Sequence, residues 1–485
     1  MHKLITHKHI LLILLAYVTI YLFTIPSTPT DTDPINFVLA LDEYNIAQDK
    51  PHPPGYPLYV SMGRLFQLFV DKQQVFPLLN LCLLLGTFVC LLTIASHFKL
   101  PHIGLVSGLL FITHPLTLYA TQSGESYISD AFFGSLILAY LVIFKHRLYW
   151  QYSGLFAIFF CLSLFRAVSC AEFAPLALCF VFLQSSRQNA FRSLSYTVLV
   201  IGCASLMGYL LTMYVGGGVE IYSSAVNRVM GENFRLQSVF GGASIDSHLS
   251  MAKKLSFWLL IVCVPLIFAY LLSRIKQLSG EASLATNKSL HWLLLAWVAP
   301  PIMLFSLIFF LKPTYLLAIL CPILICTSLY LFRLFSNPKH AWSIALAIVC
   351  LNLSFYYIGD QTLPKQFYKI THHYLMRKVD DIARIHELLA KQPSNFDVLL
   401  WDLNADLSMH TLREHAVSHP ILFPKQSLPA NPTYQALANQ GGFSFDPKSV
   451  KVTPFQQVAD FGQNLSIAFI YTESNALNIQ IYRPN

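Results

Sequence analysis

Charged residues are scarce in this 485-residue chain. Asp, Glu, Lys and Arg make up 12% of it, whereas hydrophobic residues make up 55%. An average soluble domain carries roughly twice that charged share. A single soluble core cannot bury so much apolar sequence, so we expect the chain to lie in a lipid bilayer. Much of the net charge of +8 lies in short loops between apolar runs. It therefore indicates membrane topology and not a nucleic-acid partner.

Metal and nucleotide motifs are also missing. The ten cysteines all precede residue 351, in or beside apolar runs, and none forms a Cys-x-x-Cys pair or a Cys/His cluster with zinc spacing. They are typical of small apolar helix residues and give no disulfide framework. The glycine run at 216–218 lacks the Lys-Ser/Thr that follows in a phosphate-binding loop.

Apolar runs long enough to cross a bilayer recur along the first 358 residues. A span needs about 20 mostly apolar residues. The pair at 150–165 and 170–184 is so close that it can form a tight hairpin. The first run is typical of an uncleaved signal anchor, because Pro26-Ser27-Thr28-Pro29 is a poor cleavage site. The eleven candidate spans are 9–25, 73–97, 103–119, 128–145, 150–165, 170–184, 194–215, 256–273, 291–311, 314–333 and 342–358.

The short loops indicate the orientation. With the N-terminus in the cytoplasm, nearly every short inner loop carries Lys or Arg, as the positive-inside rule requires. The outer side then receives the loops 26–72 and 216–255 and the segment 359–485, provided that the number of spans is odd. We therefore predict a multi-pass protein of the plasma membrane (a bacterial inner membrane) whose C-terminal domain is periplasmic or extracellular.

The last 127 residues have an ordinary soluble composition. Apolar residues at three- to four-residue spacing predict an amphipathic helix over 364–392. Residues 396–401, 466–471 and 479–482 are typical of strands. The predicted fold is thus an α-helical polytopic membrane domain, 1–358, followed by a small α/β outer domain, 359–485.

The first outer loop carries the most chemistry. Asp31 and Asp33 follow the first span directly, where they must face water or an internal cavity. The sequence Pro51-His52-Pro53-Pro54-Gly55-Tyr56-Pro57 then predicts a turn. The amphipathic stretch 58–70 after it is expected to lie in the membrane interface.

This loop resembles the first outer loop of GT-C class glycosyltransferases. The resemblance rests on Asp33-x-x-Asn36-Phe37 followed by the Pro-His-Pro-Pro-Gly-Tyr-Pro segment, and the motif covers about residues 31–64. The topology resembles that class over the whole chain. These polytopic enzymes, among them the protein O-mannosyltransferase-like group, use a polyprenyl-phosphate sugar as donor. The resemblance therefore implies an inverting glycosyl transfer on the outer side of the membrane.

Such a transfer needs a base near the acceptor hydroxyl and an anion near an oxocarbenium-like transition state. Asp33 is the expected general base and Asp31 the alternative, although both also suit the N-cap of a following helix. His52 either binds the donor or locks the loop.

A second, short outer loop contains Glu125 and Asp130. GT-C relatives often place an acidic residue here, for the acceptor or for a metal, so both residues are candidates for substrate binding. Asp130 equally suits a helix N-cap. No third ligand is evident, so a divalent cation is left open and no cofactor is firmly predicted.

Cations are expected near the leaving phosphate, whose negative charge they would stabilise. Arg166 interrupts an apolar run, and Lys312 and Tyr315 lie in a Lys-Pro-Thr-Tyr segment that resembles a late-span element of the class. Arg166 and Lys312 can instead snorkel to lipid headgroups. Arg228 and Arg235 lie in the loop 216–255, which is either a lid or a plain connector.

Other functions share part of this pattern. The main alternative is a transporter or flippase for a lipid-linked substrate, although no inverted repeat is evident. An anchoring protein and a ligase for pyrophosphate-linked glycans are further alternatives. The predicted partners are a polyprenyl-phosphate sugar, membrane lipids and an acceptor glycan, lipid or protein.

Overall fold

The computed structural model describes residues 7–186, 188–278, 288–335 and 337–390, together with five short strands beyond them. In this part of the chain, seven helices are long and apolar enough to cross a membrane. They are α4 (Val75–His97), α8 (Leu148–Gln184), α9 (Ala190–Val215), α11 (Ile245–Leu278), α12 (Lys288–Leu307), α13 (Leu317–Leu334) and α14 (Pro338–Ile358).

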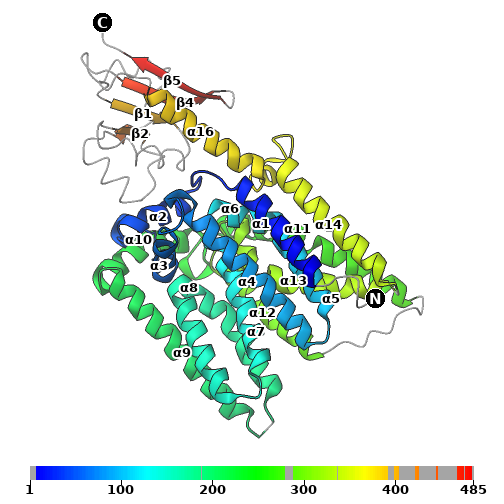
Figure 1. The fold of residues 1–485 in the computed structure, drawn as a ribbon. Helices are drawn as coiled ribbons and strands as arrows, with labels where there is room; N and C mark the ends of the chain where they lie inside the picture. Colours follow the sequence, from blue (N-terminus) through cyan, green and yellow to red (C-terminus); the bar gives the residue numbers. More distant parts are fainter. Residues whose placement is uncertain are drawn as a thin grey trace.

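Four further apolar helices belong to the same bundle (Figure 1). Helices α5 (Pro101–Thr113) and α6 (Pro115–Ser123) form a pair bent by 55° that counts as an eighth span if it crosses as one. Helices α1 (His7–Thr24) and α7 (Ile128–Ile143) are shorter. Length and composition thus give seven or eight spans among the described residues, and the expected eleven remains a prediction.

The bend between α5 and α6 has a local cause. The residue before a proline is pushed out of the helical region, and His114, which precedes Pro115, has φ −63° and ψ 132°. The single span expected over 103–119 is therefore broken.

Helix α8 turns back on itself at Arg166, whose φ of −156° and ψ of 96° are not helical. The Cys170 thiol lies 3.7 Å from the Phe159 carbonyl oxygen, although eleven residues of continuous helix would separate them by about 16 Å. The first half of α8 also runs parallel to α9, because Tyr152 contacts Ser193 and Ser163 contacts Ser205. The predicted hairpin is therefore present, and Arg166 is its turn.

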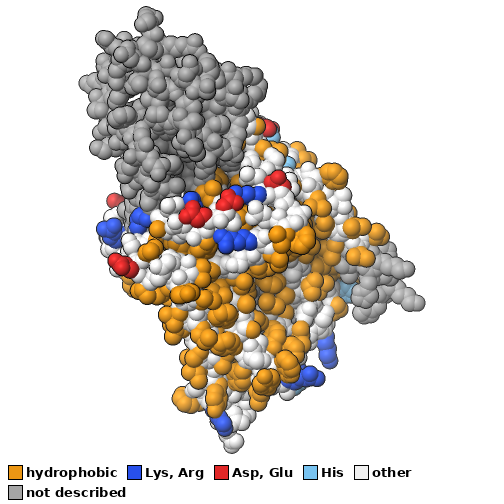
Figure 2. Space-filling view, turned by 60° about the vertical axis from the view of Figure 1, so that its left-hand side comes forward, with side chains coloured by type: hydrophobic (Ala, Val, Ile, Leu, Met, Phe, Trp, Pro, Cys, Tyr) orange, Lys and Arg blue, Asp and Glu red, His pale blue; other side chains and the backbone are white. Residues whose placement is uncertain are grey.

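Polar and apolar surfaces separate along the bundle (Figure 2). On the face shown, hydrophobic side chains cover its body, and acidic and basic side chains gather near one end. Isolated Lys and Arg side chains mark the opposite end. This distribution is typical of a protein that lies in a bilayer.

The first loop forms a compact cap at the charged end. It contains α2 (Thr32–Asp42), η1 (Ile46–Gln48), α3 (Pro57–Phe66) and η2 (Lys72–Gln74). Gly55 has a φ of +109°, and a Cβ there would lie 2.6 Å from the Ile46 side chain. Only glycine fits this turn without strain. The second long loop contains α10 (Val219–Gln237) and η3 (Val239–Gly241).

The C-terminal segment begins with two helices and continues in a sheet. Helices α15 (Lys365–Tyr368) and α16 (His372–Ala390) replace the single helix expected over 364–392. The strand order is β3-β2-β1-β4-β5, with β4 and β5 antiparallel. The strands are β1 (Val398–Asp402), β2 (Ile421–Pro424), β3 (Ser444–Phe445), β4 (Ile467–Glu473) and β5 (Ala476–Tyr482). The segments that join most of them lie outside the described residues, so the small α/β domain stays a prediction.

Candidate active site

Lys312 joins two of the predicted acidic residues. It precedes η4 (Pro313–Leu316), and its Nζ donates to Asp33 Oδ2 and to Glu125 Oε1, both at 2.9 Å. Asp33 lies in the first turn of α2, and Glu125 lies between α6 and α7. The Asp33 side chain is 22% exposed, whereas that of Glu125 is 2% exposed. Asp33 is thus the carboxylate of the two that a substrate can reach.

A second ion pair lies at the turn of α8. Arg166 Nη1 donates to Asp130 Oδ2 at 2.8 Å, and Ser169 Oγ donates to Asp130 Oδ1 at 2.6 Å. Asp130 is on the first turn of α7, but the N-cap position belongs to Tyr127. Asp130 therefore serves an ion pair and does not cap its helix.

Two tyrosines connect these ion pairs. The Arg166 guanidinium carbon lies 4.5 Å from the centre of the Tyr127 ring and 5.8 Å from that of Tyr315, within the range of a cation–π contact. The Tyr127 hydroxyl lies 3.5 Å from Asp33 Oδ2, and Lys312 Nζ lies 5.9 Å from the same ring. The two ion pairs and the tyrosines therefore form one cluster.

His52 lies beside Asp33 and is also packed. Its Nδ1 is 3.8 Å from Asp33 Oδ1, and its Nε2 is 3.2 Å from the Tyr56 hydroxyl. The ring also packs against Phe37 at 5.3 Å between centroids. Both roles expected of His52 are thus compatible with its position. Burial lowers the pKa of His52, and the nearby Asp33 only partly opposes this, so the ring is neutral at pH 7.

The two carboxyl groups that share Lys312 differ in acidity. Burial would raise the pKa of Asp33, but the charges of Lys312 and His52 and the hydrogen bond from Lys312 hold it well below its usual range. For Glu125, burial dominates and raises the pKa, and the nearby Asp31 and Asp33 raise it further against the effect of Lys312. Asp33 is therefore ionised at neutral pH, and Glu125 holds a proton more readily.

Asp31 is occupied by other partners. Its side chain makes no N-cap hydrogen bond to α2. Asp31 Oδ1 lies 2.5 Å from Lys378 Nζ, and Oδ2 accepts a hydrogen bond from the Tyr119 hydroxyl at 2.8 Å. The arrangement favours Asp33 over Asp31 as the group that meets a substrate.

The two arginines of the second long loop lie apart from these contacts. Arg228 Nη2 pairs with Asp49 Oδ1 at 2.9 Å and so ties α10 to the first loop. Arg235 is exposed on α10 and donates to the Gly231 carbonyl oxygen. Among the described residues, no three His, Cys, Asp or Glu side chains come together as a metal-ligand set.

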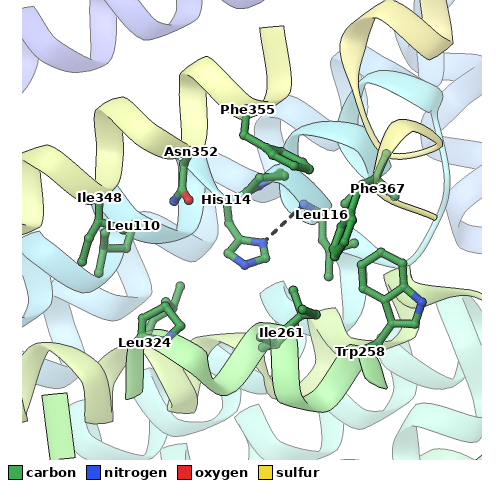
Figure 3. A pocket seen from close by; sticks show the side chains of 14 residues that line it. Leu110, His114, Leu116, Trp258, Ile261, Leu324, Ile348, Asn352, Phe355 and Phe367 are labelled. Carbon is green, nitrogen blue, oxygen red and sulfur yellow. Dashed lines mark hydrogen bonds between the residues drawn. The ribbon is translucent and has the colours of Figure 1, made fainter. Parts of the chain in front are cut away.

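An apolar cavity of about 170 Å³ lies between α5, α6, α11, α13 and α14 (Figure 3). His114 and Asn352 are its polar groups. His114 Nδ1 accepts a hydrogen bond from the Leu116 backbone at 3.3 Å, so Nε2 carries any proton of the neutral ring. Its lining residues are Leu110, His114, Pro115, Leu116, Trp258, Ile261, Val262, Pro265, Leu324, Ile348, Asn352, Phe355, Phe367 and Ile370.

This cavity lies close to the charged cluster. Trp258 in its wall is one helical turn from Lys254 on α11. The Lys254 ammonium donates to the carbonyl oxygen of Leu311, the residue before Lys312. A molecule with an apolar body and an anionic group suits this combination of an apolar wall and two lysines.

The fold resembles that of known proteins. Two solved structures share it: ArnT from Cupriavidus metallidurans bound to undecaprenyl phosphate, and ArnT from the same organism in the apo state. The first has a TM-score of 0.60 and 13% identity over 98% of each chain. The second has a TM-score of 0.59 and 12% identity over 97% of each chain. No protein-family model and no curated protein matches this chain. The GT-C fold that the sequence motif implied agrees with this likeness.

Several residues in or near the cluster were not predicted from the sequence. Tyr119 and Tyr127 lie in or near the second outer loop, where only the acidic residues were predicted to take part in the site. Lys254 and Lys378 lie among other polar residues of their helices, so their charge alone does not distinguish them. The signal for Lys254 was its place at the outer end of an apolar run, and no comparable signal exists for Lys378.

Proposed function

We propose that the protein is a membrane glycosyltransferase that moves a sugar from a polyprenyl-phosphate donor to an acceptor hydroxyl on the outer side of the membrane. The observation that carries this proposal is the bridge of Lys312 between Asp33 and Glu125, beside an apolar cavity. The undecaprenyl phosphate bound by the ArnT neighbour supports a lipid phosphate as the ligand.

In the proposed reaction, Asp33 accepts the proton of the acceptor hydroxyl. The hydroxyl oxygen forms a bond to the anomeric carbon while the bond from that carbon to the phosphate oxygen breaks. The bonding electrons pass to the polyprenyl phosphate, whose charge Lys312 and Arg166 stabilise. A single displacement inverts the anomeric configuration.

Donor binding also resolves a difficulty with Asp33. A carboxylate whose pKa is held low by an ammonium group is a weak base. When the donor phosphate draws Lys312 away, Asp33 loses the interaction that lowers its pKa. The base is therefore strengthened by the arrival of the donor.

The apolar cavity is the proposed place for the first part of the donor's hydrocarbon chain. A cavity of about 150 Å³ holds a benzene molecule, so the 170 Å³ here fits one or two isoprene units. Lys254, one helical turn from Trp258 in the cavity wall and hydrogen-bonded to the residue before Lys312, is then a further contact for the phosphate. Arg228 and Arg235 are assigned to the α10 loop and take no part in this contact.

The proposed topology retains the eleven spans. Each half of the α8 hairpin counts as one span, and α1, α7 and the bent α5–α6 pair count as one each. The N-terminus is then cytoplasmic and the charged cluster lies on the outer side. The remaining spans are α4, α9, α11, α12, α13 and α14.

The test is reconstitution in liposomes with a panel of polyprenyl-phosphate sugars and candidate acceptors. We expect transfer from at least one donor, and loss of it in Asp33→Asn with binding of polyprenyl phosphate retained. The matched control is Asp42→Asn, which removes an exposed carboxylate nine residues further along α2. Unaltered transfer in Asp33→Asn would reject this base, and movement of lipid without transfer would favour a flippase.

A further inference from the structure

A buried lysine of the C-terminal segment reaches the candidate active site. Lys378 on α16 lies 2.5 Å from Asp31 Oδ1 and 3.2 Å from the Thr30 carbonyl oxygen. Its side chain is only 7% exposed. A lysine is rarely this buried without a specific partner, so this contact is a built feature of the fold.

The partner of Lys378 begins the helix that carries Asp33. The Asp31 carbonyl oxygen accepts the Ile35 backbone N–H at 3.1 Å and so starts the hydrogen-bond ladder of α2. Tyr119 on α6 holds the other carboxylate oxygen of Asp31. Since Asp33 is two residues further on, its position depends on where Asp31 is held.

The same C-terminal helix also contacts the segment that leads to Glu125. His372 Nδ1 lies 3.1 Å from Gln122 Oε1, which accepts a second hydrogen bond from the Tyr356 hydroxyl at 2.8 Å. Gln122 is three residues before Glu125. Helix α16 thus contacts both chain segments that carry the carboxylates on Lys312.

The charges explain why a cation is needed at this place. Asp31 is buried, and the groups that act on it are Lys378 from α16, Tyr119 from α6, Lys312 before η4 and Glu125 after α6. Without Lys378, Lys312 is the remaining cation among these groups. Asp31 would then compete with Asp33 and Glu125 for Lys312.

We infer that Lys378 is a positioning residue for the active site. Through its ion pair with Asp31, it fixes the start of α2 and keeps Lys312 available to Asp33 and Glu125. The C-terminal segment is therefore part of the catalytic unit. This inference rests on the proposed function for its kinetic readout, although the ion pair itself can be tested without it.

The kinetic test compares Lys378→Met with Lys365→Met, an exposed lysine of α15. We expect Lys378→Met to lower kcat about 10- to 100-fold, as a small misplacement of a catalytic group does, with less change in KM for the donor. The acid limb of the pH–rate profile should move to higher pH, because Asp33 loses part of Lys312. Adding Asp31→Asn removes the competitor and should recover most of the loss.

Two results would overturn the inference. The first is that Lys378→Met has the same kcat as Lys365→Met. The second is that its kcat falls but the acid limb does not shift and the double variant does not recover, as expected for a merely structural role. If the wild type transfers no sugar, the proposed function fails separately. Thermal unfolding of the single and double variants in detergent then decides: non-additive changes support the Lys378–Asp31 coupling, and additive changes reject it.

Discussion

Replacing Lys312 with glutamine should make the stability of the protein depend on pH in a predictable direction. The Asp33 and Glu125 oxygens each lie 2.9 Å from Lys312 Nζ, so they are at most twice that distance apart. Two like charges about 5 Å apart repel by about 3 kcal/mol at an effective dielectric constant near 20. Because Lys312 is 34% exposed, solvent screening reduces this to about 2 kcal/mol.

The sign follows from the pKa of each acid. The pKa of Glu125 is raised in the folded protein by burial and by neighbouring carboxylates, and the variant loses the cation that opposes this. The stability of Lys312→Gln therefore falls as the pH rises from the pKa of Glu125 in the unfolded chain, near 4.3, through its raised pKa in the folded protein. In the wild type, Lys312 lowers the pKa of Asp33, so ionised Asp33 stabilises the fold above its unfolded pKa, near 3.9. The variant loses this contribution too. The deficit of Lys312→Gln should be small at pH 4 and largest near pH 8.

The assay is thermal unfolding in detergent between pH 4 and pH 8. A deficit of about 2 kcal/mol corresponds to a shift of several °C for a large domain. Lys312→Gln/Glu125→Gln should lose the part of the pH dependence that comes from Glu125 and keep the smaller part that comes from Asp33. Lys72→Gln breaks the exposed pair with Asp42 and should cost less than about 1 kcal/mol. A deficit that is flat with pH, or unchanged by Glu125→Gln, would refute the reasoning.

Three further outcomes follow from the site and its loop. Arg166→Lys keeps the charge but loses the planar contact with Tyr127, so kcat/KM for sugar transfer should fall about 100-fold. Replacement of an exposed arginine, Arg235→Gln, should change kcat/KM less than about twofold. Because burial lowers the pKa of His52, the transfer rate should show no inflection at the ordinary histidine pKa near 6.5, and an inflection there that disappears in His52→Gln would contradict this. Gly55→Ala forces a side chain into a φ of +109° and should destabilise the protein by about 1–3 kcal/mol, seen as a lower unfolding midpoint.

The helical part of the fold was largely readable from the sequence, because the thickness of a bilayer fixes the length of an apolar run. Interruptions of these runs were harder to read. A sequence shows that Arg166 breaks an apolar stretch, and it does not show whether the chain continues or reverses there. The bend at His114 had a local signal in the proline that follows it.

The site was predictable where charges are rare. Asp33, Glu125 and Lys312 stand out because each borders a long apolar run, where an ionised group needs a reason. Lys378 could not be found in this way, since α16 is an amphipathic helix with many charges. Arg228 and Arg235 show the limit of composition: a basic loop near a site gives no information about the direction of its side chains, and Arg228 pairs with Asp49 of the first loop.

The balance of charge in the cluster connects donor binding to a proton. Four carboxylates form ion pairs with three cations here, so one of these carboxylates lacks a cation of its own. They are Asp31, Asp33, Glu125 and Asp130 with Lys312, Arg166 and Lys378. A donor phosphate adds negative charge beside Lys312 and disfavours the ionised form of Glu125, whose pKa is already raised. Of the two carboxyl groups on Lys312, Glu125 is better able to take up a proton, because it is buried and its pKa is raised. Asp33, which is more exposed than Glu125, then remains free to accept the proton of the acceptor hydroxyl.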